Sequence, residues 1–152
     1  DEYYLSNVIG QPLETMIALS RLIMGGQFDR HPALKLCAVH GGGYLPNYRG
    51  RSDHAWKVRP ECDGCAHPPS HYLRHLWYDS LVFDSEELAA LIAQVGADRI
   101  VIGTDYPFDM GDYDPVGLIE AVPGLSAADR AAIMGGNACT LLGIEQSDLE
   151  KE

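Results

Sequence analysis

The first third of the chain shows a helical spacing of hydrophobic residues, followed by a short strand-like run. Over residues 15–24 the apolar positions recur with the period of a helix, and Gly25 and Gly26 follow as a stop signal. Residues 34–39 form a short apolar run that leads into glycines, as a buried parallel strand does. We expect a second helix over residues 45–57.

The middle of the chain contains a loop and a second strand-like run. Prolines, glycine and polar residues fill residues 58–70, which predicts an irregular segment. Pro69 suits the first turn of a short helix that runs to His75, because proline is tolerated there. Residues 76–83 are predicted to form the second strand.

The last part of the chain continues this alternation. Residues 86–95 have helical spacing, with Asp84 or Ser85 placed to cap the first turn and Gly96 to end the helix. Residues 99–103 predict a third apolar strand. Further helices are expected at residues 115–121, 127–134 and 137–142.

Strands that alternate with amphipathic helices indicate a parallel sheet covered by helices. Each parallel strand needs a crossover connection and is buried on both faces. The predicted fold class is therefore α/β, with about three βα units followed by C-terminal helices. A closed barrel of such units has eight strands in roughly 250 residues, so this chain would supply only part of one.

The chain is strongly acidic. Its 22 acidic and 11 basic residues give a formal net charge of -11, which repels phosphate backbones and anionic lipid headgroups. Neither nucleic acid nor a membrane is therefore an expected partner. We find no uncharged apolar run near the roughly 20 residues that span a bilayer, and no signal-peptide pattern at the start. We expect a cytoplasmic protein whose four cysteines are reduced.

His40 and Asp105 occupy the positions that most clearly suggest chemistry. Each follows a predicted strand where a turn begins, and the carboxyl ends of parallel strands are where α/β enzymes build their active sites. The glycines after His40 allow the backbone to approach a ligand closely. A structural histidine and a turn-capping aspartate are the simpler alternatives. We predict that both side chains are catalytic.

Several short motifs occur together in the order and with the spacing of a known family. They are Val39-His40-Gly41-Gly42-Gly43, Gly50-Arg51, Pro68-Pro69-Ser70, Tyr78-Asp79-Ser80, Gly103-Thr104-Asp105-Tyr106-Pro107-Phe108 and Gly136-Asn137-Ala138. In this order they resemble the decarboxylase branch of the amidohydrolase superfamily, which includes enzymes like amino-carboxymuconate-semialdehyde decarboxylase. The resemblance extends over nearly the whole chain.

The resemblance implies a fold, a metal and three residue roles. Residues 1–144 would be the C-terminal part of a metal-dependent (β/α)8 TIM barrel, and residues 145–152 an acidic tail. A divalent metal, usually zinc, would have Asp105 as a ligand. His40 matches a histidine that works as acid and base, and Arg51 matches an arginine that reaches a substrate carboxylate across a dimer interface. The expected partner is a small-molecule carboxylate substrate, with decarboxylation and hydrolysis both open.

The histidine spacing departs from the family pattern. The six histidines stand at positions 31, 40, 54, 67, 71 and 75, so the chain has no His-x-His pair. A zinc site needs three or four protein ligands, and this chain offers Asp105 and at most His40. We therefore expect the remaining ligands outside this chain, no activity from the chain alone, and a homo-oligomer or association with the missing N-terminal half. A truncated or split-gene module without activity of its own is the alternative.

Two other motifs suggest different chemistry. Cys62-x2-Cys65-x-His67-x3-His71 has ligand types and spacing that suit a small structural zinc-binding protein. The simpler interpretation is an exposed loop without metal, which is what we expect. His40-Gly-Gly-Gly also matches the oxyanion-hole motif of some esterases, but the Gly-x-Ser-x-Gly context of a serine esterase is absent from the sequence.

Overall fold

The computed structural model describes residues 2–145, which divide into two compact units between Leu76 and Trp77. The acidic tail predicted over residues 145–152 lies, apart from Glu145, outside the described residues. No helix within residues 2–145 combines the length and the apolar character that a bilayer crossing requires.

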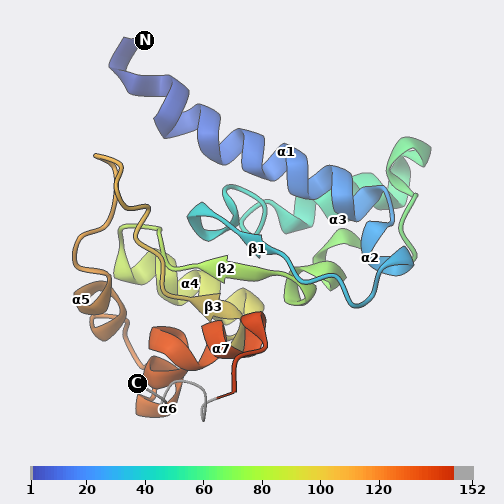
Figure 1. The fold of residues 1–152 in the computed structure, drawn as a ribbon. Helices are drawn as coiled ribbons and strands as arrows, with labels where there is room; N and C mark the ends of the chain where they lie inside the picture. Colours follow the sequence, from blue (N-terminus) through green and yellow to red (C-terminus); the bar gives the residue numbers. More distant parts are fainter. Residues whose placement is uncertain (1, 146–152) are drawn as a thin grey trace. The chain divides into compact units, whose positions relative to one another are not determined.

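The first unit is mostly helical (Figure 1). Its elements are η1 (Glu2–Tyr4), η2 (Ser6–Gly10), α1 (Gln11–Met24), α2 (Gln27–Arg30), β1 (Cys37–Ala38), η3 (His40–Gly42), α3 (Arg49–Val58), η4 (Pro60–Cys62) and η5 (Pro69–His75). The longest helix, α1, buries Leu19 and Ile23 on its inner side. The core of this unit also contains Phe28, Leu45, Tyr72 and Leu73.

The second unit contains a pair of parallel strands. Strand β2 (Trp77–Asp79) pairs with β3 (Ile100–Val101), with Tyr78 opposite Ile100 and Asp79 opposite Val101. The crossover between them consists of α4 (Ser85–Val95) and η6 (Ala97–Arg99). The chain then forms α5 (Pro115–Glu120), α6 (Ala127–Ala131), η7 (Ala132–Gly136) and α7 (Asn137–Leu142). The core of this unit includes Tyr78, Leu88, Val95, Ile100, Ile119 and Ile133.

These elements confirm the predicted α/β class. Helix α4 begins one residue before the predicted start and ends at the predicted residue, Val95. Of the two predicted caps, Asp84 is the one used, and its side chain accepts hydrogen bonds from the backbone N–H groups of Glu86 and Glu87, at 2.9 and 3.0 Å. Gly96 ends the helix with a φ of 93°, which few other residues adopt. The family motif at Asn137 also has a packing role. Its side-chain amide donates to the carbonyls of Ala97 and Ile100, at 2.7 and 2.6 Å, and so fastens α7 to the start of β3.

The predicted strands at residues 76–83 and 99–103 are too long. In the first of them, the N–H of Leu81 turns back to the Asp79 carboxylate at 3.2 Å, and the N–H of Val82 bonds the carbonyl of Ser80 at 2.9 Å. In the second, the N–H of Ile102 donates to the carbonyl of Ile133 in η7, at 3.1 Å, instead of to another strand. In both segments, apolar residues continue past the residue at which these hydrogen bonds end the pairing of β2 with β3.

Three other predicted boundaries shift. The strand at residues 34–39 is reduced to β1, and the N–H of Leu34 is used in a turn with the carbonyl of His31. The helix predicted from residue 45 begins at Arg49, because residues 43–48 form turns. The helix predicted over residues 127–134 is α-helical only to Ala131 and continues as the wider turn η7.

Candidate functional site

Asp105 lies just beyond the end of β3, in an unusual backbone conformation. Its φ is 56°, in the left-handed region that residues other than glycine rarely adopt. The residue is half-buried. Such strained positions persist only where their surroundings enforce them, and they are concentrated at functional sites. The contacts of the surrounding loop therefore bear on whether Asp105 is a functional residue.

The loop after β3 is closed by hydrogen bonds on both sides of Asp105. The carbonyl of Thr104 accepts the N–H of Asp112 at 2.9 Å, and the Thr104 hydroxyl accepts the N–H of Tyr106 at 3.2 Å. The carbonyl of Asp105 itself accepts the N–H of Phe108 at 3.0 Å. Thr104 is therefore tied to both ends of the loop, and this arrangement holds the backbone of Asp105 in place.

Two glycines allow this loop to pack closely. A Cβ atom on Gly111 would lie 2.8 Å from the carbonyl oxygen of Thr104 and 2.9 Å from that of Phe108. A Cβ atom on Gly103 would lie 2.8 Å from the Cβ of Asp79, at the end of β2. Both positions therefore require glycine for space, and Gly103 brings the loop against the end of the neighbouring strand.

His40 stands in a comparable position in the first unit. It directly follows Val39 after β1, its φ is 53°, and Gly41, Gly42 and Gly43 also have positive φ, at 59°, 82° and 61°. Gly43 lies so close to the carbonyl of Pro12 that a Cβ atom would overlap it. The glycines after His40 therefore form a tight left-handed turn, and the histidine is half-buried at its start.

Arg51 lies in the first turn of α3 and is exposed. Its backbone N–H donates to the carbonyl of Tyr48 at 3.0 Å, which fixes its place at the start of the helix. His40 and Arg51 thus belong to the first unit, and Asp105 belongs to the second.

The donor groups for a metal ion are incomplete within the described chain. Residues 2–145 contain no group of three or more His, Cys, Asp or Glu side chains placed to hold an ion. The Asp105 carboxylate is a suitable oxygen donor for zinc or manganese, but a protein site for either needs further ligands.

The loop that carries Cys62, Cys65 and His67 is held by hydrogen bonds from other parts of the first unit. The indole N–H of Trp56 donates to the carbonyl of Cys65 at 3.2 Å, and Cys65 is buried, with its thiol donating to the carbonyl of His67 at 3.3 Å. The Asp29 carboxylate accepts the N–H of Ala66 at 2.9 Å. These hydrogen bonds hold the loop in place, which is the role that a structural zinc ion would otherwise have.

Asp29 and Tyr72 form the centre of this network, which sequence reasoning missed. The Tyr72 hydroxyl donates to Asp29 at 2.6 Å, and this bond is the main reason that the pKa of Asp29 is below its usual value. Burial, and then the bond to Asp29, raise the pKa of Tyr72 to about 12. The ring of His71 packs on His67 with centroids 4.3 Å apart, and burial followed by the charges of His67 and His75 lowers its pKa.

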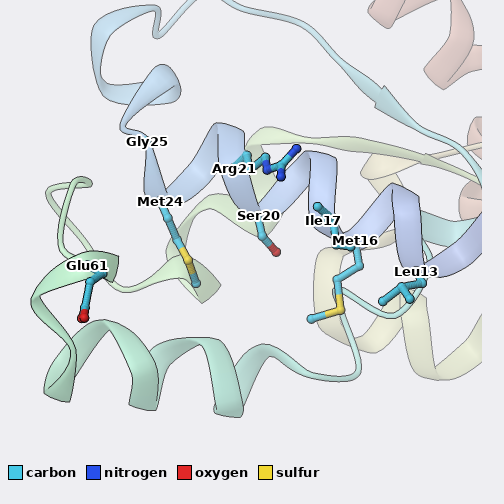
Figure 2. A pocket seen from close by; sticks show the side chains of 8 residues that line it. All are labelled: Leu13, Met16, Ile17, Ser20, Arg21, Met24, Gly25 and Glu61. Atoms are coloured by element: carbon cyan, nitrogen blue, oxygen red, sulfur yellow. The ribbon is translucent and has the colours of Figure 1, made fainter.

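A hollow of about 540 Å³ runs along α1 in the first unit (Figure 2). Its lining includes Leu13, Met16 and Met24 of α1 and Glu61 of η4. Figure 2 shows Met16, Ser20 and Met24 extending from one side of the helix. His40, Arg51 and Asp105 are not among the residues that line it, so this hollow is separate from the predicted chemistry.

Comparison with known sequences decides the family. A sequence model of the family described as Amidohydrolase matches residues 7–144. The chain belongs to the amidohydrolase family. The resemblance of the ordered motifs is therefore confirmed, and the α/β fold is that of part of the family's TIM barrel.

The chain is similar in sequence to several decarboxylases. It is 39% identical over 146 residues to 2-amino-3-carboxymuconate-6-semialdehyde decarboxylase of Dictyostelium discoideum. The matched region covers 95% of this chain and 41% of that protein. The Caenorhabditis elegans enzyme of the same name is 41% identical over 149 residues, covering 97% of this chain and 37% of that protein. A dihydroxybenzoic acid decarboxylase from Polaromonas sp. has been solved with bound manganese and the inhibitor 2-nitroresorcinol. It is 31% identical to this chain with a TM-score of 0.78, and the match covers 93% of this chain and 43% of that one.

The chain spans about two fifths of the length of these relatives. Their similarity therefore extends over nearly all of this chain, but over less than half of theirs.

Proposed function

We propose that this chain is part of a metal-dependent decarboxylase that acts on a small carboxylate substrate. In this proposal Asp105 is a metal ligand, His40 transfers a proton and Arg51 binds a substrate carboxylate. The observation that carries it is the loop that holds Asp105 at a φ of 56° beyond β3, in a chain similar over nearly its whole length to decarboxylases.

The metal is proposed to be a divalent ion with ligands from two parts of a longer polypeptide. This chain would contribute the Asp105 carboxylate, and residues outside it would complete the ligand set. The bound ion would supply positive charge against which negative charge on the substrate is stabilised. Zinc is the expectation from the sequence, whereas the solved Polaromonas relative holds manganese, so both ions are to be assayed.

The proposed roles of His40 and Arg51 follow from their chemistry. In decarboxylation the bond between the substrate carbon and its carboxylate carbon breaks, carbon dioxide leaves, and the electron pair stays on the substrate carbon. A protonated His40 imidazole would donate its proton to that carbon, which balances the reaction. The planar Arg51 guanidinium suits bidentate binding of a carboxylate. Hydrolysis would use the same groups, and release of carbon dioxide distinguishes the two.

The proposal is tested in the completed polypeptide, meaning this segment joined to the upstream part of the barrel that the resemblance implies. Metal content and carbon dioxide release are measured with 2,6-dihydroxybenzoate and with 2-amino-3-carboxymuconate-6-semialdehyde as substrates. We expect stoichiometric zinc or manganese, turnover of one of these substrates, and loss of both in Asp105→Asn. Unchanged metal content in that variant would remove Asp105 from the ligand set.

The chain by itself is proposed to be inactive and to associate with other chains. A partial barrel exposes strand edges and helix faces, which favours a homo-oligomer or binding to the upstream part of the barrel. Light scattering, metal analysis and a turnover assay on the isolated chain test this. Tightly bound stoichiometric metal and turnover from a monomer of this chain alone would refute it. A cytoplasmic location is part of the same proposal, since the reducing cytoplasm keeps thiols such as its four free cysteines unpaired.

A further inference from the structure

The ends of β2 and β3 are joined by a side chain that the proposed function does not use. Ser80 directly follows β2, is completely buried, and accepts the backbone N–H of Gly103 on its hydroxyl oxygen at 3.2 Å. Gly103 lies beyond the end of β3 and two residues before Asp105. The family motif Tyr78-Asp79-Ser80 is therefore in contact with the family motif that carries the proposed metal ligand.

The N–H of Gly103 bonds a side chain because the backbone groups that follow β2 already have other hydrogen-bond partners. The carbonyl of Ser80 accepts the N–H of Val82, and the N–H of Leu81 donates to the Asp79 carboxylate. The turn after β2 therefore uses the backbone acceptor that would otherwise continue the ladder. The Ser80 hydroxyl replaces that acceptor for the N–H of Gly103, whose loss of a partner would be costly in a partly buried place.

The position of Asp105 is then fixed from two directions. On the downstream side the loop is closed by the N–H groups of Asp112 and Phe108, which bond the carbonyls of Thr104 and Asp105. On the upstream side the Ser80 hydroxyl fixes the peptide that leads into Gly103. The close approach of Gly103 to the Cβ of Asp79 brings that peptide within reach of the hydroxyl.

We propose that Ser80 is a positioning residue, whose hydroxyl orients the segment Gly103–Asp105 so that the Asp105 carboxylate meets the metal ion. The inference rests on the proposed function, since it concerns Asp105 as a metal ligand. Residues that hydrogen-bond to a metal ligand, or orient it, without touching the metal typically contribute about 10-fold to 100-fold to metal affinity. A serine that only fills the core would not contribute in this way.

The test compares Ser80→Ala with Ser126→Ala in the completed polypeptide. Ser126 is the matched control because its hydroxyl also accepts a backbone N–H in the second unit, that of Asp129 at 3.1 Å, but it caps α6 instead of bonding the segment at Gly103–Asp105. Two quantities are measured in each variant: the dissociation constant for Mn²⁺, and the hydrogen-exchange rate of the Gly103 amide relative to that of Ile100.

For Ser80→Ala we expect Mn²⁺ binding to weaken about 10-fold or more, and Gly103 exchange to accelerate by about the same factor. Ser126→Ala should change both by less than about twofold, even if its melting temperature falls as far. Asp105→Asn is measured in parallel. If it weakens Mn²⁺ binding while Ser80→Ala behaves like Ser126→Ala, the positioning role is wrong and the proposed function stands. If Asp105→Asn leaves Mn²⁺ binding unchanged, the metal assignment fails and the role of Ser80 fails with it.

Discussion

The Tyr72 hydroxyl donates a hydrogen bond of 2.6 Å to the carboxylate of Asp29, across 43 residues of sequence. The same carboxylate accepts the N–H of Ala66, so one side chain of α2 holds both η5 and the cysteine-containing loop. Because this hydrogen bond lowers the pKa of Asp29, we expect the stability of the first unit to depend on pH.

The first prediction concerns acid stability. The folded-state pKa of Asp29 lies below its usual value, so the carboxylate contributes stability above that usual value and loses it as pH falls through the lower, folded value. Asp29→Asn should flatten this acid dependence, and Tyr72→Phe should weaken it, because the pKa then returns toward its usual value. Urea unfolding at pH values from about 2.5 to 6 measures the effect.

Asp63→Asn is the control for this prediction, since it removes an acid of the same unit outside the network. An acid dependence in Asp29→Asn that matches the unchanged protein would show that the bond to Tyr72 does not stabilise the fold.

The second prediction concerns the cysteine-containing loop. Because hydrogen bonds from Asp29 and Trp56 already order it, Cys62→Ser with Cys65→Ser should leave the zinc content unchanged. The melting temperature should shift by no more than a few degrees, since serine retains a donor for the carbonyl of His67. Loss of one equivalent of zinc together with a lower melting temperature would establish a structural zinc loop instead.

The third prediction separates proton transfer from metal binding. His40→Ala in the completed polypeptide should reduce turnover by about 100-fold or more, which is the usual contribution of general acid–base catalysis, while metal content is unchanged. His54→Ala is the control, because it removes an exposed histidine of α3 in the same unit. Turnover of His40→Ala close to that of the control would reduce His40 to a structural residue of the glycine turn.

The fourth prediction concerns substrate binding. Arg51→Ala should raise KM for a carboxylate substrate about tenfold or more, because it removes a charge-assisted contact, with a much smaller effect on an uncharged analogue. Arg49→Ala removes a second arginine from the first turn of α3 and should leave KM nearly unchanged. Equal effects of Arg51→Ala on charged and uncharged substrates would indicate a packing role.

The fifth prediction tests the loop around Asp105 through its backbone. Gly111→Ala would place a Cβ atom 2.8 Å from the carbonyl of Thr104, so the loop must shift and Mn²⁺ affinity should fall, by about tenfold. Gly135→Ala is the matched control, since a Cβ atom there meets nothing within 4 Å. Equal Mn²⁺ affinities of the two variants would show that the close packing at Gly111 is not needed to place Asp105.

Elements with local signals were predictable from the sequence. Helix α4 has its capping aspartate, its apolar period and its terminal glycine within a single stretch, so its bounds were predictable to within one residue. The ordered motifs likewise identified the family, because they need only residue identity and spacing. His40 and Asp105 were chosen for the same local reason, that each follows an apolar run at a turn.

The tertiary structure decided what depends on residues far apart in the chain. The strands are shorter than their apolar composition suggested, because Leu81 and Ile102 direct their N–H groups to Asp79 and to the carbonyl of Ile133. The bond from Tyr72 to Asp29 and that from Gly103 to Ser80 connect positions 43 and 23 residues apart. Neither leaves a pattern in composition or periodicity, because a hydrogen bond depends on where two atoms meet and a sequence period reports only which face of an element is buried.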